Sequence, residues 1–199
     1  MRPIDDIEVI DNFISPSYLT ELNQAVDPKL MHWNFNGTQT FHPAAISDGS
    51  GSLEDFGFSI VLCCSNQPNL FYDTKLSTFI RPLVYKIKDY VGASTIFRSQ
   101  LDLTILHKQK YIHPPHIDRD SIDNECVSAI FYINDTDGET IIYDNKYDRA
   151  PSSFPTNMKI KKTIEPKPGR LLLFDTRYVH TGCSPSEHQT RILLNTVLL

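Results

Sequence analysis

The sequence predicts a mainly β fold with flanking helices, arranged as an antiparallel sandwich or barrel. Two observations predict this class. Apolar residues recur at helical spacing within the first 92 residues, whereas after Gly92 the apolar period changes to two, which is typical of half-buried strands. Turn signals containing Gly and Pro then separate at least six short apolar runs. Helices followed by short strands indicate a sheet structure that helices cover on one side.

The first helix is expected soon after the N-terminus. Residues 7–14 have the pattern of a short strand that runs into a helix. Ser15 is a good N-cap residue, and Pro16 suits the first helical position because its missing N–H has no partner there in any case. Pro28 ends the apolar pattern, so the helix should stop before it.

The remainder of the N-terminal part combines a loop, a strand and a second helix. Residues 34–57 are rich in Gly and polar residues, and a lid over a site and a plain loop are both compatible with them. Residues 58–64 form a continuous apolar run that predicts a buried strand. A second helix is expected from residue 76 to Gly92, and Pro82 inside it predicts a kink or a restart.

The second half of the chain is expected to be the β core. Its predicted strands cover residues 101–106, 127–133, 140–143, 158–164, 171–174 and 190–198. We expect residues 1–199 to form a single domain, in which 1–92 supply a helical buttress with the lid loop and 93–199 the core.

Composition excludes several classes of protein. The net charge of −5 argues against a protein that coats nucleic acid, because such proteins need a dominant basic surface. The four cysteines contain no Cys-x-x-Cys pair, which favours a reduced, intracellular protein. The chain has no apolar run of 18 residues and its first residues lack the apolar centre of a signal peptide, so we expect a cytoplasmic protein without a membrane partner. Its oligomeric state is not predicted.

A metal site is predicted around His116 and Asp118. Because they lie two residues apart, both side chains leave the same face of an extended segment. His180 lies downstream, at the end of an apolar run, and a barrel could bring it beside His116. Two imidazoles and one carboxylate are the ligands of the non-haem Fe(II) oxygenases. Two unrelated surface histidines and a solvated aspartate would give the same pattern.

Arg191 provides an independent indication of an anionic ligand. It lies 11 residues after His180, on a predicted strand whose two faces are largely apolar. A guanidinium in such a place is costly unless it meets an anion, and its planar fork suits a carboxylate. The alternative is that Arg191 is the exposed first residue of its strand.

Together these motifs resemble the Fe(II)/2-oxoglutarate-dependent dioxygenases of the prolyl 4-hydroxylase-like branch. The resemblance extends over most of the chain and keeps the family's order of motifs. The matching segments are residues 11–16, 115–118, 129–134, 138–140, 168–175 and 180–182.

The resemblance implies a double-stranded β-helix, or jelly-roll, with the metal in its mouth. His116, Asp118 and His180 would bind Fe(II), with no further catalytic residue. Arg191 would pair with the distal carboxylate of 2-oxoglutarate, and Tyr132 would contact the same carboxylate. Dioxygen completes the set of cosubstrates, and ascorbate is an accessory cofactor in this branch.

The implied activity is hydroxylation of a C–H bond, of a prolyl residue or of proline, with release of succinate and carbon dioxide. The substrate would be a peptide, a protein or a small molecule, contacted by loops 34–57 and 144–157. Arg191 departs from the lysine of the collagen-type enzymes, and Asp137 replaces the first glycine of a Gly-Gly turn. Val197 stands where the nucleic-acid demethylase branch has a second arginine, which argues against a base oxygenase. The main alternative is a jelly-roll metal-binding module without catalysis.

Overall fold

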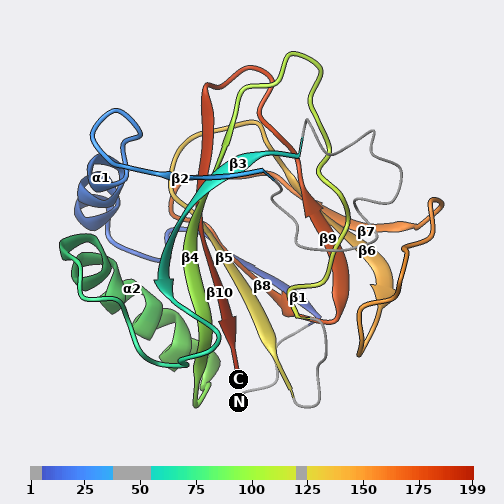
Figure 1. Cartoon of the computed structure of the whole chain (residues 1–199), viewed down its shortest axis with the longest axis horizontal. Helices are drawn as coiled ribbons and strands as arrows, with labels where there is room; N and C mark the ends of the chain where they lie inside the picture. The colour runs from blue at the N-terminus through green and yellow to red at the C-terminus, as the bar shows by residue number, and fades with distance from the viewer. Residues whose placement is uncertain (1–5, 38–54, 120–124) are drawn as a thin grey trace.

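The computed structural model describes residues 6–37, 55–119 and 125–199 (Figure 1). Within these ranges the chain forms two helices, α1 (Pro16–Ala25) and α2 (Lys75–Val91), together with ten strands. The strands are β1 (Ile7–Ile10), β2 (Asn34–Asn36), β3 (Gly57–Cys63), β4 (Ile96–Ile105), β5 (Val127–Tyr132), β6 (Thr140–Lys146), β7 (Ile160–Ile164), β8 (Leu171–Asp175), β9 (Tyr178–Gly182) and β10 (Thr190–Leu198).

The strands make two antiparallel sheets. The large sheet has the order β1-β8-β5-β10-β4-β3-β2, and the small sheet has the order β7-β6-β9. An apolar cluster joins the inner faces of the two sheets. Its members are Ile130, Tyr132, Ile142, Ile164, Leu172, Phe174, Tyr178 and Leu193. This is the predicted jelly-roll.

Both helices cover the outer face of the large sheet, on the left in Figure 1. Because side chains alternate along a strand, β10 sends Ile192 and Leu194 toward the helices and Leu193 toward the small sheet. All six residues of β5 are buried for the same reason, since the strand has a packed layer on each side. The central strands therefore pack one face against the helices, and their other face, toward the small sheet, can carry the side chains of a site.

The helices form as their sequences predict, with one exception. Ser15 caps α1, and its side chain accepts a hydrogen bond from the backbone of Tyr18. Gly92 ends α2 in the left-handed conformation, with a φ of 69°. Of the kink or restart expected at Pro82, the restart does not occur, because α2 runs through this residue as one helix. Tertiary packing of its buried apolar face outweighs the lost hydrogen bond.

The N-terminal part contributes more than a helical buttress, since β1, β2 and β3 are strands of the large sheet. The predicted lid falls mostly on residues 38–54, outside the described residues. All four cysteines have free thiols. None of the helices in the described ranges is long and apolar enough to cross a membrane.

Candidate active site

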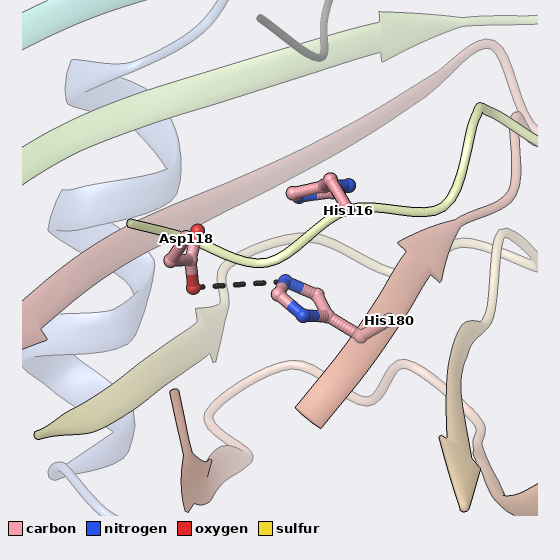
Figure 2. Close-up of side chains that lie close together, drawn as sticks. All are labelled: His116, Asp118 and His180. Atoms are coloured by element: carbon pink, nitrogen blue, oxygen red, sulfur yellow. Dashed lines mark ion pairs between the residues drawn. The ribbon is translucent and has the colours of Figure 1, made fainter. Parts of the chain in front are cut away.

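His116, Asp118 and His180 lie together, as the spacing in the sequence predicts. Their ligand atoms are all within 4.8 Å of one another, and Figure 2 shows the three side chains converging. His180 comes from β9, whereas His116 and Asp118 come from the segment that follows β4.

The local backbone differs from the prediction. His116 and Asp118 do not lie on a regular strand, and His180 lies in the middle of β9 instead of at the end of an apolar strand. His116 and His180 instead form an isolated antiparallel bridge. Each backbone N–H donates to the other residue's carbonyl, at 2.9 Å in both directions. These two bonds fix the separation of the two imidazoles.

Neighbouring side chains hold the Asp118 carboxylate in place. Ser128 donates a hydrogen bond to Oδ2, and Nη2 of Arg98 donates to Oδ1 at 3.0 Å. Nε2 of His180 lies 3.6 Å from Oδ2. Burial opposes ionisation, but the charges of His180 and Arg98 outweigh it and hold the pKa of Asp118 well below its usual range. Asp118 is therefore ionised at neutral pH.

Both histidines present the tautomer that a metal needs. Nδ1 of His116 lies 3.3 Å from the carbonyl of Pro114, and Nδ1 of His180 lies 3.0 Å from the carbonyl of Tyr178. A carbonyl can only accept, so each Nδ1 carries the hydrogen and Nε2 keeps its lone pair. Burial, together with the nearby charge of His180, lowers the pKa of His116 to about 3, so this imidazole is neutral.

The donor set fits a divalent metal of the iron type. Two imidazoles and one carboxylate are the 2-His-1-carboxylate set, which leaves further coordination positions open. His113 is not part of it. Its two ring nitrogens hydrogen-bond to Asp55 at 2.8 Å and to Ser184 at 3.0 Å.

Arg191 is buried, with 6% of its surface exposed, so it is not the exposed start of its strand. Nε donates to the carbonyl of Gly138 at 2.7 Å, and Nη2 donates to Oγ1 of Thr140 at 2.9 Å. A guanidinium has five N–H groups, so three remain for a ligand. Among the described residues, no carboxylate lies within 4.0 Å of its nitrogens. The other three N–H groups are therefore available to an anionic ligand.

Two glycines make room for this guanidinium. A Cβ on Gly138 would lie 2.7 Å from Cδ of Arg191 and 2.5 Å from the carbonyl oxygen of Cys183. A Cβ on Gly182 would lie 3.1 Å from Nη1 of Arg191. Side chains at either position would displace the guanidinium or the backbone beside it.

Tyr132 contacts the site through Thr140, which was not among the predicted site residues. Its hydroxyl donates to Oγ1 of Thr140 at 2.6 Å, and the ring is almost fully buried. Thr140 also accepts from Arg191 and lines the cavity. Thr140 is two residues after Gly138 and pairs with Gly182 across β6 and β9. Thr140 lies in a segment that resembles the family, but its place beside Arg191 depends on this pairing, which local sequence patterns do not reveal.

The triad and Arg191 line the same cavity, which has a volume of about 900 Å³. Ile130 and Leu193 supply apolar surface, and a polar wall comes from β4 and β10. The triad and the guanidinium of Arg191 are therefore both accessible to a single ligand in this cavity.

The family model of the 2OG-Fe(II) oxygenase superfamily matches residues 103–198, which include the triad and Arg191. The chain resembles the 2OG-Fe(II) oxygenases. No curated protein matches it in sequence.

Solved structures show the same fold as this 2OG-Fe(II) oxygenase-like chain. An oxidoreductase of the 2OG-Fe(II) oxygenase family from Burkholderia pseudomallei matches with a TM-score of 0.64 and 11% identity, over 97% of this chain and 85% of that one. A prolyl hydroxylase from Trichoplax adhaerens, in complex with a peptide of hypoxia inducible factor, matches with a TM-score of 0.61 and 16% identity, over 97% and 83%. The alpha ketoglutarate dependent epimerase SnoN matches with a TM-score of 0.62 and 14% identity, over 97% and 78%.

Proposed function

We propose that this protein is an Fe(II)- and 2-oxoglutarate-dependent dioxygenase that hydroxylates a C–H bond. The observation that supports it best is one cavity lined by a 2-His-1-carboxylate set and by a buried guanidinium with three unused N–H groups. In this proposal His116, Asp118 and His180 hold the iron. When bound, the iron supplies the oxidation by dioxygen, coupled to conversion of 2-oxoglutarate into succinate and carbon dioxide.

Arg191 and Thr140 bind the distal carboxylate of 2-oxoglutarate. Oγ1 of Thr140 already accepts hydrogen bonds from Tyr132 and Arg191, so both of its lone pairs are occupied. Its own hydrogen is then directed away from these partners and can donate to the carboxylate. Tyr132 thus acts through Thr140, a more distant role than direct contact with the cosubstrate.

The surroundings of Arg191 favour an anion of this kind. A buried charge without a counter-ion destabilises the protein, and a dianionic cosubstrate relieves this penalty. Ile130 and Leu193 keep part of the cavity apolar, which limits access of water to the reacting atoms. The protein's part in the reaction is to position the reactants, hold the charge and exclude water.

The substrate in this proposal is a prolyl residue or proline. The Trichoplax relative was solved with a peptide, whereas SnoN is an epimerase of nogalamycin biosynthesis, so the shared fold accepts dissimilar substrates. Loop 147–159, which joins β6 and β7, is a source of substrate contacts. Ascorbate is expected to sustain turnover by keeping the iron reduced.

The deciding experiment measures succinate and metal content together. Protein purified without oxygen is given Fe(II), 2-oxoglutarate and oxygen, and succinate is expected even without substrate, at a slow rate. His180→Ala should lose both bound iron and succinate, whereas His32→Ala, at an exposed position, should keep both. Failure of wild-type protein to form succinate and to bind 2-oxoglutarate would refute the proposal. Metal bound without either property would identify a non-catalytic binding module instead.

A further inference from the structure

One wall of the cavity has polar groups that the proposed reaction does not use. Gln100, Asp102 and Thr104 on β4, and Asn195 on β10, all line the cavity. Alternate residues of a strand point to the same face, so the three residues of β4 form a continuous polar row.

The pairing of β4 with β10 brings Asp102 and Asn195 close together. Asp102 is opposite Leu193, and Gln100 is opposite Asn195. Asp102 and Asn195 are therefore diagonal neighbours on one face of the sheet, close enough to contact one ligand group. Gln100 donates from Nε2 to Oδ1 of Asp102 at 2.7 Å and so orients the carboxylate toward its neighbours.

Within the described part of the chain, two of these residues have a buried side-chain oxygen without a hydrogen-bond partner. Asn195 has 9% of its surface exposed, and its Oδ1 is buried without a hydrogen bond. Thr104 has 5% of its surface exposed, and its Oγ1 is likewise buried without a hydrogen bond. A buried, unsatisfied polar atom destabilises a protein, and when several line one cavity they indicate a ligand that satisfies them.

The Asp102 carboxylate forms no ion pair with the described residues, although it accepts a hydrogen bond from Gln100. In the described part of the chain, no Lys or Arg nitrogen lies within 4.0 Å of its carboxylate. The guanidinium of Arg98 is bonded to Asp118, and that of Arg191 is bonded to Gly138 and Thr140. If 2-oxoglutarate neutralises Arg191, as the proposed function requires, Asp102 remains the uncompensated anion of this wall.

We propose that the Asp102 carboxylate and Oδ1 of Asn195 bind a protonated amino group of the substrate. This inference rests on the proposed function and narrows its substrate class to small molecules with a free amine, such as an amino acid. An ammonium group offers two or three N–H donors and a positive charge, which matches two adjacent acceptors and one negative charge.

The same chemistry distinguishes free proline from a prolyl residue. Free proline has a charged nitrogen with two hydrogens. The nitrogen of a prolyl residue within a peptide has no hydrogen and no charge, so it offers nothing to these acceptors. Of the two substrates named above, the polar wall therefore favours the free amino acid.

The test compares amino acids with their Nα-acetyl derivatives, including L-proline with N-acetyl-L-proline. Each is titrated by calorimetry under nitrogen into protein loaded with Fe(II) and 2-oxoglutarate. At least one free amine should bind about tenfold or more tightly than its acetylated partner, because acetylation removes a charge-assisted hydrogen bond. Asp102→Asn, which keeps the shape and loses the charge, should abolish this preference. Asp135→Asn, at a side chain that is 81% exposed, should preserve it.

The outcomes separate the two proposals. If wild-type protein forms succinate but no amine in the panel is preferred over its acetylated partner, the amine site is refuted and the dioxygenase proposal stands. A preference that persists in Asp102→Asn also refutes the amine site. If no succinate forms and 2-oxoglutarate does not bind, the proposed function fails independently of the amine measurements.

Discussion

Replacement of Arg191 by methionine tests the cosubstrate site most directly. Methionine fills a similar volume without charge or N–H groups. Arg191 uses two N–H groups within the protein, and two of the remaining three can hold one carboxylate. Each such charge-assisted bond contributes roughly 1.5–3 kcal/mol, and a side chain with 6% exposure receives little solvent screening. We therefore expect 2-oxoglutarate to bind roughly two to four orders of magnitude more weakly.

The assay is calorimetric titration of 2-oxoglutarate into Fe(II)-loaded protein under nitrogen. Arg191→Lys is the matched control, because it keeps the charge and loses the planar fork. Its affinity for 2-oxoglutarate should lie between those of wild-type protein and Arg191→Met. Iron content should be unchanged in both variants, since Arg191 is not in the triad. A loss of affinity smaller than about threefold in Arg191→Met would refute the assigned role of the guanidinium.

Three further predictions concern the metal ligand, the polar wall and the core. Ser128→Ala removes the hydroxyl that orients Asp118 and should weaken Fe(II) binding about tenfold in a metal titration; unchanged affinity would contradict this role. Burial raises the pKa of Asp102 to about 6. The positive charges of Arg98 and Arg191 lower this pKa, whereas the negative charge of Asp118 raises it further. Because the neutral acid lacks the charge an ammonium needs, the preference for a free amine should fall as the pH drops through about 6, and a pH-independent preference would exclude Asp102. Leu83→Ala, at a side chain buried between α2 and the large sheet, should lower the free energy of unfolding by about 2–5 kcal/mol in urea denaturation, whereas a loss below about 1 kcal/mol would show that the site refills.

Much of the fold follows from local chemistry. The period of three and four residues in α2 reflects its buried face, and Gly92 readily adopts the left-handed conformation of a C-cap, so the sequence predicts both features well. Of the kink or restart expected at Pro82, no restart occurs, because the local rule gives no weight to the packing of the whole helix. The triad was predictable because His116 and Asp118 are close in sequence and the order of the motifs resembles a family.

The rest of the site depends on long-range pairing. Thr140 joins the site because β6 pairs with β9, and Asn195 faces Asp102 because of the register of β4 with β10. No local pattern distinguishes these residues from other polar side chains in strands. The irregular backbone at His116 has a local cause. Pro114 and Pro115 have no N–H and cannot continue a ladder, so a single bridge forms in place of a strand.

That bridge has a consequence for how an ion would enter and leave the protein. The two histidines are joined through their own backbones, so their spacing is set by peptide geometry before any ion arrives. Binding then requires little reordering of the chain, and its rate should depend mainly on how fast the ion sheds water. By the same reasoning, a chelator should strip the ion and leave a folded protein whose empty site accepts a new ion without refolding.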